Sequence, residues 1–150
     1  MKFSSAVVFS LGALLISQAA QAQFAKPEDA VKYRKNAFFV MQQHYARIGA
    51  MTAGRVPFDA KVAQDNAETA LFMAKLPWAA FGEGTDKGDT KAKAEIWKEM
   101  DKFKDGSEKM VAEMQKLVAA TRTGNLDNVK ASFTAASGSC KNCHDAYREK

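Results

Sequence analysis

The sequence contains little cysteine, histidine and proline. Its 150 residues include only 2 Cys, 2 His and 3 Pro. Two cysteines are too few for a disulfide-rich scaffold or for a zinc site with four cysteine ligands. The low proline content, with 47% hydrophobic and 26% charged residues, excludes a disordered or collagen-like chain. A chain of this length fits one domain.

A dense basic stripe and a membrane-spanning apolar run are also missing. The net charge is +5 and both signs are interspersed, which gives no indication of a nucleic-acid partner. The one long apolar run, residues 6–16, follows Lys2 and is too short to span a bilayer. It precedes Ala20-Gln21-Ala22, which has the form of a signal-peptidase site. We predict a secretory signal at residues 1–22 and a mature domain at residues 23–150, with no membrane span in the mature form. A membrane anchor is the alternative for the first segment.

Four segments have the character of helices. Three show apolar residues at alternating spacings of three and four, and the second is rich in alanine. Proline, glycine and a capping residue, Asp59, mark several of their ends. The segments are residues 27–54, 59–76, 92–122 and 126–150. Four such helices predict an all-α protein, an antiparallel four-helix bundle.

The loop between the second and third helices, residues 77–91, contains several glycines and two large aromatic residues, Trp78 and Phe81. Aromatic side chains of this size are costly to leave in water, so this loop is expected to pack onto the bundle. Methionines on the third helix, such as Met110 and Met114, are expected to fill the core rather than bind a metal.

Both cysteines lie in the motif CKNCH at residues 140–144. The pattern C-x-x-C-H is the attachment signature of c-type haem. Cys140 and Cys143 lie on one side of a helical turn, where two thiols can join the two vinyl groups of one porphyrin edge. His144 can then bind the iron as an axial ligand. The sequence therefore predicts covalently attached haem c.

Three alternatives exist for this motif. A structural disulfide would not require His144. A thioredoxin-like redox pair usually follows a strand, and none precedes this one. A zinc site would need a further ligand, such as His44 or a carboxylate.

The second axial position determines what the iron can bind. Only six residues follow His144, so a second ligand must come from upstream, and residues 27–54 are expected to form the opposite wall. If Phe38 points at the iron, His44 lies about 120° around the helix and ~9 Å along it, and is expected to flank the site. Met41 lies only ~60° from Phe38 and is the competing ligand. A blocking Phe38 leaves a five-coordinate iron that can bind a small neutral diatomic molecule and excludes larger or charged ligands.

Three segments together resemble the cytochrome c′ family, the class II c-type cytochromes. They are CKNCHDAYR at residues 140–148, QFAKPEDAVKYR at residues 23–34 and LPWAAFG at residues 76–82. The resemblance covers essentially the whole predicted mature chain. Class I cytochromes c instead carry the motif near the N-terminus and a methionine ligand downstream, and no methionine follows the motif here.

The resemblance implies a periplasmic homodimer of left-handed four-helix bundles. Family members bind nitric oxide, and often carbon monoxide, at a five-coordinate iron. Phe38 falls where the family has an apolar residue over the distal face, and low-spin relatives have a methionine ligand there. Phenylalanine is bulkier than the leucine of some relatives, and the size of this side chain affects how easily carbon monoxide reaches the iron. The small side chains on one face of the helix at 59–76 are expected to support dimerisation.

The resemblance also implies a set of residues around the haem and its propionates. They are Arg34, Lys35, Trp78, Phe81, Asp89 and Arg148. For the two arginines, the alternative is a solvated helix face.

Three functions are then open. In the first, the protein binds nitric oxide at an open iron and retains electron-transfer capability. In the second, it is a six-coordinate, low-spin electron carrier with Met41 as ligand, and Lys141, Arg148 and Lys150 form a basic docking rim. The third is an enzyme such as a peroxidase, which needs a distal acid–base pair that the sequence does not place near Phe38. We predict the first, with no enzymatic activity, and keep the second as the alternative.

Overall fold

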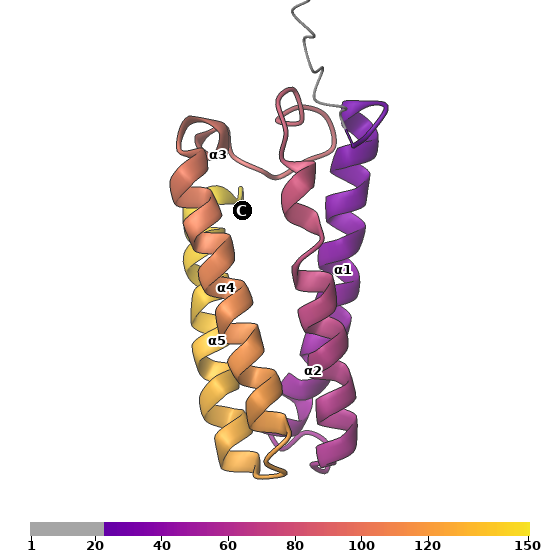
Figure 1. The fold of residues 1–150 in the computed structure, drawn as a ribbon, viewed down its shortest axis with the longest axis vertical. Coiled ribbons are helices and arrows are strands. Elements are labelled where there is room, and N and C mark those ends of the chain that lie inside the picture. The colour runs from indigo at the N-terminus through magenta and orange to yellow at the C-terminus, as the bar shows by residue number, and fades with distance from the viewer. Residues whose placement is uncertain (1–22) are drawn as a thin grey trace, which may run out of the picture.

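Four long helices, running alternately in opposite directions, make up most of the computed structural model, which describes residues 23–150 (Figure 1). They are α1 (Pro27–Thr52), α2 (Ala60–Ala74), α4 (Met100–Thr121) and α5 (Leu126–Tyr147). Short turns at the lower end in Figure 1 join α1 to α2 and α4 to α5, and a longer connection crosses the upper end. That connection contains the 3₁₀ helix η1 (Pro77–Ala80) and the one-turn helix α3 (Glu95–Lys98).

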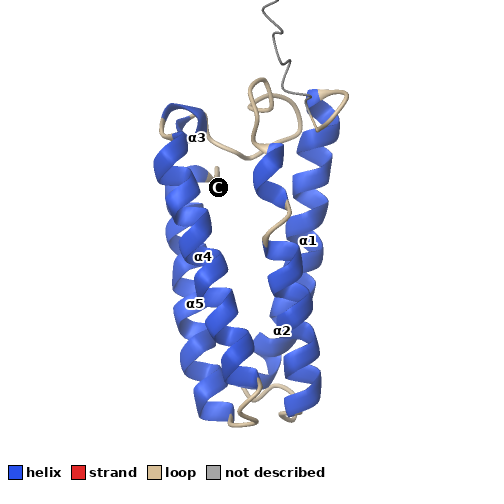
Figure 2. Ribbon diagram, viewed as in Figure 1, coloured by secondary structure: helices blue, strands red, loops and turns tan. Residues whose placement is uncertain are grey.

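Within the described part of the chain, Figure 2 shows helices and loops but no strand. No helix among these residues has the length and apolar character needed to cross a membrane. The predicted signal peptide, residues 1–22, lies outside the described residues.

The helix ends follow from local chemistry. Pro27 occupies the first turn of α1, where its missing N–H costs nothing. The Asp59 carboxylate accepts a hydrogen bond of 2.9 Å from the backbone N–H of Val62 and caps α2. Asn125 caps α5 in the same way. The turn before it contains Gly124 at φ 65°, a left-handed conformation that favours glycine.

The alanine-rich face of α2 lies inside the bundle. Ala63, Ala67, Ala70 and Ala74 are fully buried, and α2 packs closely against both α1 and α4. The expectation that this face supports dimerisation is therefore wrong, because the small side chains serve helix packing within one chain.

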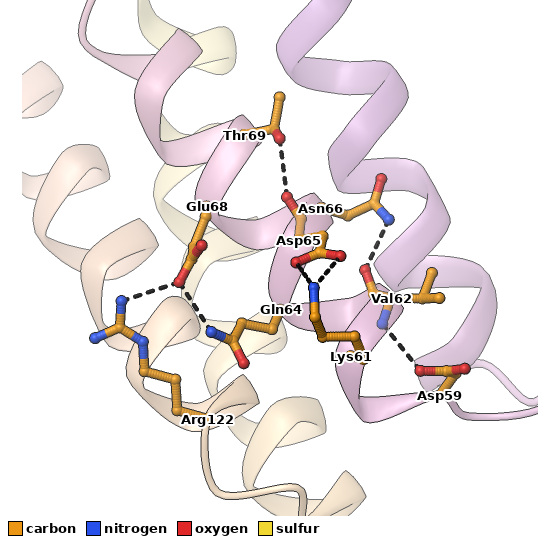
Figure 3. A network of polar contacts seen from close by, with 9 residues as sticks. All are labelled: Asp59, Lys61, Val62, Gln64, Asp65, Asn66, Glu68, Thr69 and Arg122. Atoms are coloured by element: carbon orange, nitrogen blue, oxygen red, sulfur yellow. Dashed lines mark hydrogen bonds and ion pairs between the residues drawn. The ribbon is translucent and has the colours of Figure 1, made fainter.

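A polar network on the outer side of α2 joins this helix to the end of α4 (Figure 3). One oxygen of the Glu68 carboxylate accepts hydrogen bonds from Gln64 (3.1 Å) and from Arg122, which follows α4 (2.9 Å). These two bonds, Gln64 first, lower the pKa of Glu68. The Glu68 and Arg122 side chains are about half exposed, so the network orients the helix surfaces more than it stabilises the fold.

The third helix begins later than the sequence predicts, and the fourth ends earlier. Ala92 forms an isolated β-bridge with Arg148, and backbone hydrogen bonds of 2.8 and 3.0 Å flank this bridge. Residues 148–150 are therefore extended, and α5 ends at Tyr147. Glu99, at φ −125° and ψ 41°, separates α3 from α4. At both places the local sequence favours helix. The pairing of the C-terminal residues with the segment before α3 replaces it there.

Candidate functional site

A cavity of about 1190 Å³ lies at the end of the bundle that holds α3 and the C-terminus. Residues of α1, η1, α4 and α5 line it, together with the segment around residues 89–92. Every residue that the sequence predicts for the site lines this one cavity. They are Arg34, Lys35, Phe38, Met41, Trp78, Phe81, Asp89, Cys140, Cys143, His144 and Arg148.

The two thiols line the cavity from the last turns of α5. Both are free and half-buried. Cys140 packs against the main apolar core, and Cys143 packs against a second apolar cluster around Phe81 and Phe103. Burial raises the pKa of both thiols, so they are protonated at neutral pH.

His144 follows directly on the same helix. Burial, and then the charge of Arg148, lower the pKa of its imidazole. The ring is therefore neutral at pH 7, and one nitrogen keeps a lone pair for a metal ion. Among the described residues, no group of three or more His, Cys, Asp or Glu side chains could hold a metal by itself. A metal at His144 would therefore need a carrier that supplies its other ligands.

The wall on α1 presents Phe38 and Met41 to the cavity. The Phe38 ring packs edge to face against Trp78, with 5.5 Å between the ring centres. His44 lies on another side of α1, where its Nδ1 is 2.9 Å from the Oδ1 of Asn66 on α2. This agrees with its expected place beside the site rather than in it.

Arg34 is a buried cation at the edge of the cavity, with 2% of its surface exposed. Its guanidinium donates four hydrogen bonds of 2.7–3.0 Å to Ala80, Thr85 and Thr90, and so ties α1 to the loop after η1. Burial lowers its pKa from 12.5 to about 10, and Asp86 opposes this shift, so Arg34 stays charged at neutral pH. The alternative of a solvated helix face is therefore wrong for Arg34.

Among residues 23–150, Arg34 takes part in no ion pair with a carboxylate. A buried cation of this kind favours an anionic partner in the cavity.

The other charged residues lie at the cavity's rim. Lys35 forms an ion pair with Asp89 and also donates to the Asp89 carbonyl oxygen (3.2 Å), so two of the predicted residues pair with each other. Arg148 is exposed at the end of α5, and its backbone N–H bonds to the carbonyl oxygen of His144 (3.0 Å).

Several important residues were not among the predicted ones. Thr85 and Thr90 fix the Arg34 guanidinium, yet their glycine-rich loop has no periodicity that could reveal them. Tyr45 lines the cavity, and its hydroxyl donates to the Phe133 carbonyl oxygen (2.9 Å). Its place on the apolar stripe of α1, between Met41 and Ile48, was the available signal.

These features fit a covalently bound haem. The cavity exceeds the ~300–1,000 Å³ of common small-ligand sites. Its walls are largely aromatic and aliphatic, two free thiols reach it from one helix, and a neutral imidazole stands beside them. The buried charge of Arg34 suits the carboxylates of such a group.

Comparisons with known proteins agree with this assignment. The sequence profile described as Cytochrome C' matches residues 29–148. The cytochrome c' of Rubrivivax gelatinosus is 45% identical over 129 residues, which cover 85% of this chain and 100% of that protein. The cytochrome c' of Alcaligenes xylosoxydans xylosoxydans is 45% identical over 128 residues, which cover 85% and 99%.

Solved structures give the same result. The crystal structure of the Rubrivivax gelatinosus protein matches with a TM-score of 0.82 at 44% identity, over 85% of this chain and 100% of that one. The nitric oxide complex of a mutant of cytochrome c prime from Alcaligenes xylosoxidans matches with a TM-score of 0.80 at 44% identity, over 85% and 99%. The predicted all-α four-helix bundle is confirmed.

Proposed function

The chain belongs to the cytochrome c′ family, whose members carry covalently attached haem c, and we propose that it binds nitric oxide at a five-coordinate haem iron in the periplasm. Gas binding itself is supported by the nitric oxide complex of a relative that is 44% identical. The five-coordinate state and the location are our proposals for this chain.

The residues of α5 hold the cofactor in this proposal. The haem, when bound, supplies an iron that can take a gas ligand and exchange one electron. Cys140 and Cys143 provide the sulfur atoms for the two thioether bonds, and their protonated state protects them from oxidation before attachment. His144 provides the imidazole that binds the iron, and its lowered pKa keeps it neutral for this role.

The observation that carries the proposal is the nature of the wall on α1. Phe38 lines the cavity, whereas the chain's other histidine, His44, is hydrogen-bonded to Asn66. A phenyl ring has no lone pair to donate to iron, so it leaves a position that a ligand can reach by displacing the ring. The apolar ring favours a small neutral ligand, because a charged one would lose its hydration without compensation.

Residues around the cofactor have supporting roles. We propose that Arg34 compensates the charge of a propionate and that Lys35, paired with Asp89, adds positive potential at the same edge. Trp78 and Phe81 form the apolar wall, and Arg148 lies on the side of His144. Phe38 and Met41 offer no acid–base pair of the kind that peroxidases use, so we propose binding and electron transfer rather than enzymatic turnover.

One observation favours a second candidate function. Met41 also lines the cavity, and a thioether bound to the iron would make the protein a six-coordinate, low-spin electron carrier. Absorption spectra of the ferric and ferrous protein, with and without nitric oxide, distinguish the two. We expect high-spin spectra that change on addition of nitric oxide. A low-spin spectrum at neutral pH that is lost in Met41→Ala, but kept in Phe38→Ala, would establish the carrier instead.

The location and assembly are proposed on separate grounds. We propose that the segment at residues 1–22 directs export and is removed, which the N-terminal sequence of the purified protein would test. We further propose a homodimer through the outer sides of α1 and α2. Exposed apolar side chains on these helices support it, namely Val40, Val62 and Phe72.

A further inference from the structure

Trp78 lies directly behind the residue proposed to cover the iron. Its ring meets Phe38 edge to face, at 5.5 Å between centres and 78° between planes. Phe81 is the other aromatic neighbour of Phe38 and lies farther away, at 6.5 Å. Trp78 is therefore the nearest aromatic support of the Phe38 ring.

Trp78 is itself held firmly. Its indole N–H donates a hydrogen bond of 2.6 Å to the carbonyl oxygen of Ala74, in the last turn of α2. Its ring packs edge to face against Phe103 of α4, at 5.7 Å. The residue before it, Pro77, is buried and fixes the start of η1. The indole is thus anchored to two helices and is a rigid support for a neighbouring ring.

We propose that Trp78 is a positioning residue that holds the Phe38 ring in place and thereby limits the rate at which nitric oxide reaches the iron. This inference rests on the proposed function. A ligand that must displace Phe38 also has to break the contact between Phe38 and Trp78. Weakening that contact therefore lowers the barrier to binding while leaving the haem attachment intact.

A competing role for Trp78 is visible in the structure. The indole also lines a shallow groove of about 300 Å³ on the outside of the bundle, beside Lys75 and Val111. Trp78 thus contributes to both the groove and the cavity. It could act as a direct barrier between them, independently of Phe38, and the experiment has to separate the two roles.

The chain offers a matched control in its second tryptophan. The indole N–H of Trp97 donates to the carbonyl oxygen of Gly82 at 2.9 Å, and its ring packs against Phe81 at 6.2 Å. The aromatic contacts of Phe38 are with Trp78 and Phe81. Trp97→Leu therefore removes a comparable indole that makes no direct aromatic contact with Phe38 and reaches it only through Phe81.

The test measures the association rate of nitric oxide with the ferrous haem-loaded protein by stopped-flow absorption. We expect Trp78→Leu to raise the rate by about two- to tenfold, the effect of losing one edge-to-face aromatic contact. Trp97→Leu should leave the rate unchanged. If Trp78→Leu does not fold, Trp78→Phe, which keeps an aromatic ring but loses the hydrogen bond to Ala74, should raise the rate by a smaller factor.

Two further measurements make the result decisive. In the Phe38→Ala background, Trp78→Leu should have no additional effect on the rate. An equal increase in both backgrounds would show a direct barrier and overturn the inference, as would an unchanged rate in the wild-type background. Crystal structures should show the Phe38 ring displaced or in several positions in Trp78→Leu but not in Trp97→Leu. A parent protein that binds no nitric oxide would overturn the proposed function, whereas binding at an unchanged rate would overturn only this inference.

Discussion

The guanidinium carbon of Arg34 lies 4.3 Å from the centre of the Phe81 ring. This cation–π contact joins α1 to Phe81, the residue that follows η1. The same guanidinium donates to the backbone oxygens of Ala80 and Thr85. One side chain thus fixes the loop that closes one side of the cavity, and its conformation depends on contacts remote in sequence.

Replacement of Arg34 by methionine should destabilise the folded protein strongly. Methionine keeps much of the side chain's length but leaves the buried oxygens of Ala80 and Thr85 without donors. We expect a loss of about 2–4 kcal/mol in the free energy of unfolding, measured by urea denaturation of the haem-loaded protein. Arg47→Met on the exposed side of the same helix is the control and should change it by less than about 0.5 kcal/mol. Equal effects at both positions would contradict this account of Arg34.

Gly49 marks a close approach of α1 to α5. A methyl group at this position would come within 2.9 Å of the tip of the Phe133 ring. That ring cannot move freely, since it stacks on Tyr45 with 4.4 Å between centres. Gly49→Ala should therefore lower the melting temperature and cost about 1–3 kcal/mol, despite the better helix propensity of alanine.

Gly106→Ala is the matched control and should raise the melting temperature rather than lower it. Gly106 also lies inside a helix, α4, but nothing lies within 4 Å of the added methyl group. The substitution should stabilise the protein by about 0.5–1 kcal/mol. Stabilisation by alanine at both glycines would show that α1 and α5 are not in close contact at Gly49.

Tyr45 makes the stability of the folded protein sensitive to pH in the alkaline range. Burial raises the pKa of its phenol from 10 to about 12, against a smaller opposing effect of the hydrogen bond with Ser137. Between these values the unfolded chain loses the phenolic proton while the folded protein keeps it. The contribution of Tyr45 to the free energy of unfolding should therefore fall with rising pH by about 1.4 kcal/mol per unit over this interval, whereas Arg34, with its lowered pKa, contributes a change of opposite sign.

Tyr45→Phe isolates that contribution. The variant should be less stable at pH 8 by about 1 kcal/mol, because the Phe133 carbonyl oxygen and Ser137 lose a partner. Between pH 10 and 12 the stability of the wild type should fall relative to that of the variant, because the contribution of Arg34 is common to both proteins. Equal slopes in the two proteins, measured by urea denaturation across this range, would show that Tyr45 does not carry the effect.

Much of the fold could be predicted from patterns that are local in sequence. The spacing of Phe38, Met41 and Tyr45 reveals the inner side of α1, and the motif at residues 140–144 places both thiols on one face of α5. Covalent chemistry requires this short spacing, so the motif is visible without a structure. A residue that has to meet a partner one turn away leaves a periodic signal of the same kind.

Contacts between distant segments could not be predicted in this way. The bridge between Ala92 and Arg148 replaces helix at two places where propensity favours it. The threonine partners of Arg34 lie in a loop without periodicity. The alanine face of α2 illustrates a different problem, since small residues allow close packing but do not specify whether the partner helix belongs to the same chain.

The proposed dimer makes a final prediction about the outer side of α2. Phe72 and Val62 are 63% and 45% exposed, which is unfavourable for an isolated bundle and suits a surface covered by a second copy. Phe72→Glu places a charge in that interface and should convert the protein to a monomer in sedimentation at micromolar concentration. Val56→Glu is the control, because Val56 is 47% exposed but lies in the turn between α1 and α2. A wild-type monomer, or a Phe72→Glu dimer as stable as the wild type, would show that this side of α2 does not mediate self-association.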